Sequence, residues 1–549
     1  MNNLAALVLR HVDARPAHVA LVLPRSWDGA GGGVVEDVLT YGDIGARVRG
    51  LMTGLARAGI GAGDRIIVLV PPGPELFTLV IALFGVGATA VLIDAGMSKP
   101  RIVQAMASAG ARGIVSVGKL LARWPLLPPL WRVRRWSLDS HGRGVAPFSD
   151  LMVELAPGAS GEPSPALPRR PDDEGLITFT SGSTGRPKGA DRTQGILLAQ
   201  HHALAAHVPR RADAVDMPCF PVVALHNLCL GITTVMPPCD LRAPASADGA
   251  LVLRHARKWG VTSIAGAPAF MARLAEAGAG PGGERVPTLE RYEVGGAPVT
   301  RALCAALAAG LPGAHGHVIY GSTEAEPIGG IEMAELLATP GQGFLVGRPD
   351  PACAVELVSL PPEAGGSAGQ GGPRPLPEGL ARYRVAPGQP GEVIVSGAHV
   401  NRRYVGNPGA NRENKLEVGG TIWHRTGDVG HLDGQGRLWL TGRVSDLVAH
   451  AGRTLHPLII EAALDAAPGV RRSALVAHPR APEGEVALEL DGAASTDATL
   501  TAARAALAAH DLRLPIRVVA TIPVDGRHNS KIDRPTLRRS LEKEPRRAQ

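Results

Sequence analysis

Cysteine and aromatic residues are both scarce in this sequence. Its five cysteines form no CxxC pair and no Cys/His spacing of the kind that binds metal. An odd, unpaired set in a chain of this size argues against a disulfide framework, so we expect a reducing, cytoplasmic location. Aromatic residues make up 3% of the chain. Since neither an aromatic RNA-binding box nor zinc-finger spacing occurs, we expect no nucleic-acid partner.

A convincing membrane span is also missing. Residues 76–93 are free of charge over a length that could cross a bilayer. This stretch changes from helical to strand-like character and is interrupted by glycine, which favours a buried helix followed by a buried strand. The first residues lack a basic segment before a long apolar run, so they do not resemble a secretion signal. We therefore expect no transmembrane span.

The composition is that of a folded protein with ample core. Hydrophobic residues make up 45% of the 549 residues and charged residues 19%, which is typical of globular chains. A chain of this length exceeds the usual size of a single core, so we expect at least two domains. The formal net charge of +7 is compatible with a polyanionic small substrate or an anionic membrane surface.

Short apolar runs alternate with helical segments in the N-terminal half. Runs at 66–71 and 89–94 are rich in β-branched residues, and a helical pattern follows each of them. Further β-rich runs end at clusters of glycine, serine or proline near residues 180, 266 and 321. This alternation is the signature of parallel α/β layers. Ligands bind at the carboxyl ends of strands in such sheets, so motifs at these positions are candidate sites.

The strongest local motif is TFTSGSTGRPKGA, residues 178–190. It places hydroxyl groups and unobstructed backbone N–H groups directly after a strand, followed by a lysine. Such a loop can surround phosphate oxygens, with the lysine as a mobile positive charge. A Walker A loop is excluded, because Pro187 and Gly189 occupy the positions where it needs glycine and Ser/Thr. We assign to nucleotide binding Thr180, Ser181, Gly182, Ser183, Thr184, Gly185 and Lys188.

This motif resembles the phosphate loop of the adenylate-forming superfamily, which contains acyl-CoA synthetases, luciferases and nonribosomal peptide adenylation domains. Four further blocks occur in the order of that family: YGSTE (320–324), HRTGDVG (424–430), GRVSDLV (442–448) and HNSKIDR (528–534). The resemblance covers about residues 40–535. It implies an enzyme that uses ATP and Mg²⁺ to join a carboxylic acid to AMP, with release of pyrophosphate.

The resemblance also implies roles for individual residues. Glu324 would bind Mg²⁺, Tyr320 would stack on adenine and Thr323 would contact the α-phosphate. Asp428 and Arg443 would contact the ribose. Lys531 would bridge the substrate carboxylate and the α-phosphate. The implied catalytic residues are Lys531, Thr184, Glu324 and Lys188, and the implied nucleotide site also includes Gly296, Ala297, Pro298, Gly321 and Ser322.

Two domains of unequal size are expected. The implied fold class is α/β, with a large N-terminal adenylate-forming (AMP-binding) domain of layered α/β sheets at 1–442 and a small mobile C-terminal α+β lid domain at 443–549. The pattern of elements also changes near residue 443. In the family the small domain rotates, so that Lys531 is present for adenylation and is withdrawn afterwards. The pivot position matches Ser445, where many relatives have Asp or Lys.

Several stretches resemble one branch, the olefin β-lactone synthetases of long-chain hydrocarbon biosynthesis. They include residues 70–97, 292–300 and 341–349, and the Arg-His-Asn that precedes Lys531. The implied substrate is a long-chain β-hydroxy acid, whose own β-oxygen attacks the activated carbonyl and closes a β-lactone. His226 and Glu326 are candidates by chemistry for the base. The sequence departs from this branch at Ser322, where alanine is usual, and in a less aromatic acyl region around 220–230.

Two other interpretations stay open. In the first, the thiol of coenzyme A or of a carrier protein attacks the adenylate of a fatty acid; Ala224 stands where such ligases usually have histidine, and the loop at 449–454 resembles their pantetheine tunnel only loosely. In the second, the chain is a binding protein without catalysis or a membrane-associated subunit that joins pathway enzymes. Residues 123–136 interleave aromatic, proline and basic residues, a composition suited to an acidic partner or to peripheral membrane contact.

Replacing the predicted catalytic lysine tests the activation step. We expect Lys531→Ala to lower the rate of adenylate formation by orders of magnitude, because the cation that bridges the substrate carboxylate and the α-phosphate would be lost. The measurement is the rate of acid-dependent pyrophosphate release. An unchanged rate would mean that the wrong lysine has been assigned.

Overall fold

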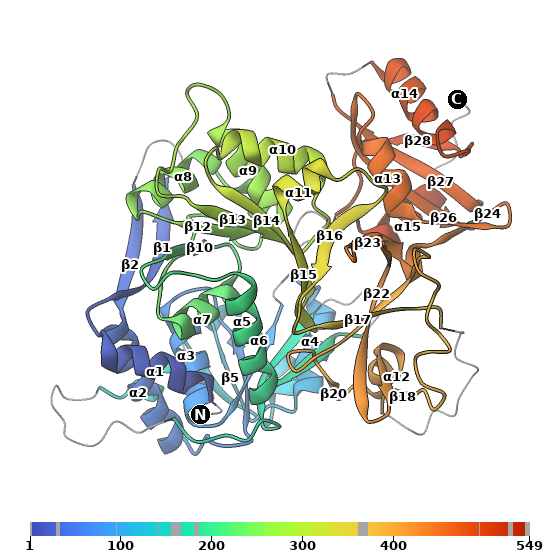
Figure 1. The fold of residues 1–549 in the computed structure, drawn as a ribbon. Helices are drawn as coiled ribbons and strands as arrows, with labels where there is room; N and C mark the ends of the chain where they lie inside the picture. Colours follow the sequence, from blue (N-terminus) through green and yellow to red (C-terminus); the bar gives the residue numbers. More distant parts are fainter. Residues whose placement is uncertain are drawn as a thin grey trace.

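Layered sheets and helices form the body of the molecule (Figure 1). The computed structural model describes residues 3–28, 33–94, 96–140, 142–154, 166–180, 186–360, 372–492, 495–524 and 531–543. Within these ranges the strands form sheets of fifteen, eight, two and three strands. None of the helices in the same ranges is long and apolar enough to cross a membrane.

The eight-stranded sheet contains the first predicted strands. Its order is β20 (Tyr404–Val405), β9 (Lys188–Thr193), β8 (Glu174–Thr180), β4 (Thr89–Ile93), β3 (Arg65–Leu69), β5 (Gly113–Ser116), β6 (Arg134–Ser137) and β7 (Ala146–Pro147). The strands β8, β4, β3, β5 and β6 are parallel neighbours. The uncharged stretch at 76–93 forms helix α3 (Pro74–Gly85) and strand β4, which confirms the prediction of a buried helix and strand.

The fifteen-stranded sheet has a parallel part and an antiparallel part. In spatial order it contains β17 (Ala354–Val358), β19 (Gly391–Ser396), β22 (Thr421–Leu432), β23 (Leu438–Arg443), β16 (Phe344–Pro349), β15 (Ala325–Glu332), β14 (His315–Ser322), β13 (Arg291–Gly295), β12 (Ser263–Gly266), β10 (Val215–Pro218), β11 (Thr233–Val235), β1 (Val19–Trp27) and β2 (Val34–Thr40). Two short strands, β18 (Arg374–Pro375) and β21 (Lys415–Val418), join it through β22. The run from β10 through β12 and β13 to β14 is parallel, as predicted.

Helices cover both faces of each large sheet. Ile66 and Val68 of β3 pack with the helices that lie between the sheets, whereas Ile67 packs with α4 on the far face, as the two-residue period of a strand requires. The helices between the sheets are α1 (Leu4–Ala14), α2 (Tyr41–Arg57), α3, α6 (Gln194–His207) and α7 (Pro221–Leu230). The outer helices are α4 (Lys99–Ala109) and α5 (Gly118–Leu121) on one side and α8 (Gly249–Lys258), α9 (Pro268–Gly278), α10 (Arg301–Gly310) and α11 (Met333–Ala338) on the other; α12 (Pro408–Asn414) precedes β21. This layering confirms the predicted α/β fold class.

A separate group of elements follows β23 and lies at the upper right of Figure 1. It contains β24 (Val448–His450), β25 (Arg453–Leu455), β26 (Val470–His478), β27 (Ala481–Leu490) and β28 (Ile516–Val519), with α13 (Pro457–Asp465), α14 (Thr496–Ala508) and α15 (Arg534–Lys543). Two hydrophobic clusters in this part contain only residues from 448 onward. A smaller α+β unit therefore follows the large sheets; its boundary at 442/443 stays a prediction.

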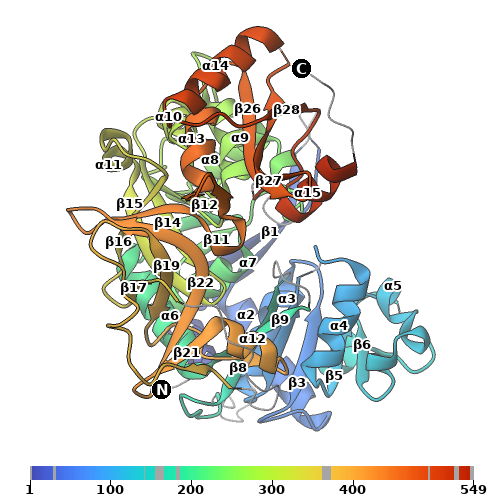
Figure 2. The same cartoon turned by 90° about the vertical axis from the view of Figure 1, so that its right-hand side faces the viewer.

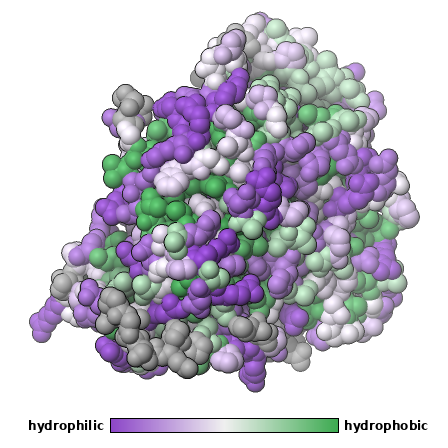
Figure 3. Space-filling model, turned by 60° about the vertical axis from the view of Figure 1, so that its left-hand side comes forward, coloured by the Kyte–Doolittle hydropathy of each residue, from purple (hydrophilic) through white to green (hydrophobic). Residues whose placement is uncertain are grey.

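One exposed edge of the fifteen-stranded sheet faces the viewer in Figure 3. Hydrophobic side chains gather there in a band bordered by hydrophilic ones. On the β1–β2 hairpin, Trp27, Val35 and Val38 are 40%, 57% and 46% exposed. Strand β2 ends the sheet.

Candidate active site

Most of the predicted site residues line one cavity of about 2600 Å³. Its walls come from both large sheets and from the C-terminal unit. The predicted residues that line it are Lys188, Gly296, Ala297, Pro298, Tyr320, Gly321, Ser322, Thr323, Glu324, Asp428, Arg443 and Lys531. Thr180 ends β8 opposite Lys188 of β9. Ser181, Gly182, Ser183, Thr184 and Gly185 lie outside the described residues, as do the Arg-His-Asn at 527–529.

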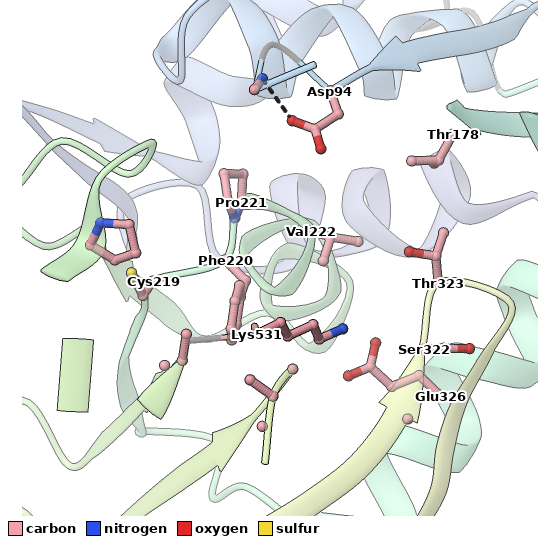
Figure 4. Close-up of a pocket in the computed structure, with 18 of the residues that line it drawn as sticks. Asp94, Thr178, Cys219, Phe220, Pro221, Val222, Ser322, Thr323, Glu326 and Lys531 are labelled. Atoms are coloured by element: carbon pink, nitrogen blue, oxygen red, sulfur yellow. Dashed lines mark hydrogen bonds between the residues drawn. The ribbon is translucent and has the colours of Figure 1, made fainter. Parts of the chain in front are cut away.

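Two chemically opposite side chains extend into this cavity. Figure 4 shows the ammonium group of Lys531, the carboxylate of Glu326 and the hydroxyl group of Thr323 pointing into it. Lys531 comes from the C-terminal unit, whereas Glu326 lies in β15 and Thr323 in the turn between β14 and β15. A cation, a carboxylate and a hydroxyl group are thus available in one cavity.

Asp428 is the centre of a hydrogen-bonded group at the predicted ribose site. The β22–β23 register places Asp428 opposite Arg443, and the Nε of Arg443 donates to its Oδ1 at 3.0 Å. The hydroxyl group of Tyr320 donates to Oδ2 at 2.8 Å. Burial and the charge of Asp428 raise the pKa of Tyr320, and Asp428 raises the pKa of Arg443. Tyr320 therefore stays neutral and Arg443 stays charged at neutral pH.

Glu324, the predicted magnesium ligand, is oriented by a residue that sequence reasoning missed. The hydroxyl group of Tyr404 donates to Oε1 of Glu324 at 2.8 Å, and the backbone N–H of Asn401 donates to the carbonyl oxygen of Glu324 at 2.7 Å. Burial opposes ionisation of Glu324, but the neighbouring His424, then Lys415 and the Tyr404 hydrogen bond, outweigh it and lower its pKa. The carboxyl group is held in one orientation and in its charged form.

A fully buried lysine lies behind this carboxylate. The Nζ of Lys415 donates to the carbonyl oxygen of Asn401 at 2.5 Å and lies 4.9 Å from the centre of the Tyr404 ring. Burial lowers the pKa of Lys415 to about 7, while Glu324 acts in the opposite direction. The β21–β22 register pairs Lys415 with His424. Burial lowers the pKa of His424 to about 3, so at neutral pH this imidazole is uncharged, whereas Lys415, with a pKa of about 7, is partly protonated.

Lys188 extends the same group of cations toward the predicted phosphate loop. Its Nζ donates to Oδ1 of Asn414 at 3.3 Å and lies 3.6 Å from a carboxylate oxygen of Glu413. It also lies 5.9 Å from the centre of the Tyr404 ring. A polyanion that enters the cavity would meet Lys188 and Lys531 from different elements.

The residues present fit a magnesium ion. In the described part of the chain no group of three or more His, Cys, Asp or Glu could hold a metal. Mg²⁺ needs no such cage, because it keeps several waters and binds one or two carboxylates together with substrate phosphates. The single ionised carboxylate of Glu324 in the cavity meets this requirement.

The predicted acyl region contains a pair of histidines. His226 lines the cavity, as does His201, and their Nδ1 atoms are 3.0 Å apart. One imidazole must donate and the other accept, so they have opposite tautomers. Burial lowers the pKa of His226 to about 3 and that of His201 to about 4. His226 was a candidate from the sequence; its partner was not.

The predicted pivot is tied to the segment that contains Lys531. Asp446, next to Ser445, lies 3.2 Å from the Nε of Arg534 and 3.2 Å from a guanidinium nitrogen of Arg538. Arg534 also forms an ion pair with Glu461 at 2.7 Å. Helix α15, which begins at Arg534, is thereby joined to the turn after β23. These acidic partners were not found from the sequence.

Comparison with known proteins agrees with this geometry. The family model described as AMP-binding enzyme matches residues 8–405. Olefin β-lactone synthetases of Xanthomonas campestris and Stenotrophomonas maltophilia are each 32% identical to the chain, cover 97% of it and are covered over 96% and 97% of their own length. A feruloyl-CoA synthase of an Amycolatopsis species is 28% identical, with 82% of each chain covered. The structure of an O-succinylbenzoate CoA synthetase from Bacillus subtilis with ATP and magnesium ion has a TM-score of 0.72 at 19% identity, covering 98% of this chain and 99% of that one.

Removing one hydroxyl group tests the orientation of Glu324. We expect Tyr404→Phe to raise the Mg²⁺ concentration needed for half-maximal adenylation about tenfold, since a hydrogen bond to a charged group contributes roughly 1.5–3 kcal/mol. The measurement is pyrophosphate release against Mg²⁺ concentration. Tyr383→Phe, at a position outside the cavity lining, is the matched control and should leave the requirement unchanged. An equal Mg²⁺ requirement in both variants would contradict the role given to Tyr404.

The histidine pair predicts a loss of stability in acid. The pKa of His226 falls from 6.5 to about 3 on folding, so its contribution is fully present above pH 6.5 and is lost as the pH falls toward 3. The unfolding free energy of the wild type should decrease between pH 6.5 and about pH 4. In His226→Gln we expect this decrease to be smaller by about 1 kcal/mol or more. Denaturant unfolding at several pH values measures this loss. His315→Gln changes an exposed histidine away from the pair and should reproduce the wild-type pH dependence. A wild-type slope in His226→Gln would refute the assignment.

Proposed function

The chain belongs to the AMP-binding enzyme family, and from that premise we propose that it adenylates a long-chain β-hydroxy acid and then cyclises the product to a β-lactone. It is an ATP-dependent acid-activating ligase of the adenylate-forming type. The finer proposal is supported above all by the likeness to olefin β-lactone synthetases, which extends over 97% of the chain. We also propose the division into domains at 1–442 and 443–549.

In the first step, a carboxylate oxygen of the acid attacks the α-phosphorus of ATP and pyrophosphate leaves. We assign to Lys531 the neutralisation of charge between the carboxylate and the α-phosphate, because its ammonium group extends into the cavity. Thr323 would donate a hydrogen bond to the α-phosphate, and Asp428 with Arg443 would hold the ribose. Bound at Glu324, Mg²⁺ would supply further positive charge to the phosphates.

In the second step, the β-hydroxyl oxygen attacks the acyl carbon, and the bond from that carbon to the AMP oxygen breaks. The hydroxyl group and the acyl carbon belong to one molecule, so no thiol is needed. The carbon chain of the acid itself holds the two groups close to each other. A base must accept the hydroxyl proton. We favour Glu326 over His226, because Glu326 extends into the cavity with Lys531 (Figure 4), whereas the pKa of about 3 makes His226 a weak base.

The second candidate is a CoA ligase. It shares the first step, and the likeness to a feruloyl-CoA synthase over 82% of the chain favours it. In that reaction the thiol sulfur of coenzyme A, and not the β-oxygen, attacks the acyl carbon and AMP leaves. The two candidates differ only in the nucleophile.

Product analysis separates the two candidates. Purified protein is incubated with ATP, Mg²⁺ and a long-chain 2-alkyl-3-hydroxy acid, with and without coenzyme A. We expect β-lactone and AMP without coenzyme A, and no lactone from the matched acid that lacks the 3-hydroxyl group. We expect Glu326→Gln to keep acid-dependent pyrophosphate release and to lose most lactone formation. Strict dependence on coenzyme A would establish the ligase instead, and normal lactone yield in Glu326→Gln would remove Glu326 as the base.

A further inference from the structure

An exposed surface of unusual composition lies beyond α5. It contains Leu126 and Trp131, which are 80% and 58% exposed, together with the exposed cations Lys119, Arg123 and Arg132. We call these five residues the basic-apolar surface. In the described ranges, none of these three cations takes part in an ion pair. Large exposed apolar side chains beside unpaired cations mark an interaction surface.

The backbone holds the two apolar side chains outward. Residues Trp124–Leu126 and Pro128–Leu130 form two single-turn 3-10 helices, because the prolines prevent a continuous amphipathic helix. Between the exposed residues, Leu130 is buried. The indole N–H of Trp131 donates to the carbonyl oxygen of Pro125 at 3.0 Å. Its ring is thus fixed at the surface.

The surface lies in the most basic segment of the chain. Residues 96–138 contain eight Lys or Arg and no Asp or Glu. Removing those eight from the total of 57 leaves 49 basic residues against 50 acidic ones. This segment alone carries a net charge of +8, whereas the rest of the chain sums to −1. Such a concentration favours a partner with a dense negative surface.

The same segment forms part of the cavity wall. Leu120 of α5, next to Lys119, lines the cavity, as do Arg101 and Ile102 of α4. Figure 2 shows α4, α5 and β6 together at one margin of the molecule, away from the C-terminal unit. A partner bound at the basic-apolar surface would lie beside the cavity without blocking movement of that unit.

We propose that the basic-apolar surface docks on an anionic lipid bilayer. Trp131 and Leu126 would enter the headgroup region, where indole rings and short apolar side chains are favoured, and Lys119, Arg123 and Arg132 would contact lipid phosphates. Docking of this kind brings the cavity next to the phase in which a long-chain acid dissolves. The inference needs only an apolar acid as substrate and does not depend on lactone formation.

Vesicle binding tests the proposal with the full-length protein. Sedimentation is measured with vesicles of phosphatidylcholine alone and of phosphatidylcholine mixed with phosphatidylglycerol. We expect at least tenfold tighter binding to the anionic vesicles, and weaker binding as salt is added. Leu126→Ser with Trp131→Ser should lower this affinity at least tenfold. The matched control, Val35→Ser with Leu337→Ser, changes two other exposed apolar residues and should bind as the wild type does.

Activity on a short, water-soluble acid separates docking from misfolding. The Leu126→Ser, Trp131→Ser variant should release pyrophosphate from that acid at the wild-type rate and lose rate only on a vesicle-borne long-chain acid. The proposal is overturned if the wild type does not bind anionic vesicles, if the control pair loses as much affinity as the test pair, or if only an acidic protein, and no vesicle, is bound. Failure of lactone formation alone would leave vesicle binding unaffected, so the two proposals fail separately.

Discussion

The hydrogen bond from Tyr404 to Glu324 joins the two large sheets at the cavity. Tyr404 belongs to β20 of the eight-stranded sheet, whereas Glu324 follows β14 of the fifteen-stranded sheet. Lys415, buried behind them, and the Tyr404 hydrogen bond are among the groups that lower the pKa of Glu324. A carboxyl group must be deprotonated to bind a metal ion. The two sheets therefore meet at the carboxylate that we propose as the magnesium ligand.

The position of the proposed catalytic lysine depends on a different set of contacts. Lys531 belongs to the C-terminal unit, which has hydrophobic clusters of its own. Asp446 in the turn after β23 pairs with Arg534 and Arg538 beyond Lys531. The position of Lys531 in the cavity is thus coupled to the turn that we predict to be the pivot. Each rotation of the unit would have to keep or exchange these ion pairs.

The sequence was most informative where structure is decided locally. β-Branched runs and flanking glycines identified β3, β4, β8 and β14, because strand propensity and turn chemistry depend on neighbouring residues. The family motifs led to Glu324, Asp428 and Lys531, which line one cavity. Their partners were not predictable in the same way. Tyr404 reaches Glu324 across 80 positions, and Lys415 meets His424 only through strand register. His201 could not be predicted as the partner of His226, because the two meet only through the packing of α6 beside α7.

The most direct test of the account is isotope exchange between pyrophosphate and ATP. Adenylation by this route is a reversible step in which the acid displaces pyrophosphate while Glu324 would hold Mg²⁺. We expect labelled pyrophosphate to enter ATP only when a suitable acid and Mg²⁺ are present, without any thiol, and Glu324→Gln to abolish nearly all of this exchange. Exchange that needs no acid, absence of exchange across a graded series of fatty and hydroxy acids, or an undiminished rate in Glu324→Gln would contradict the account.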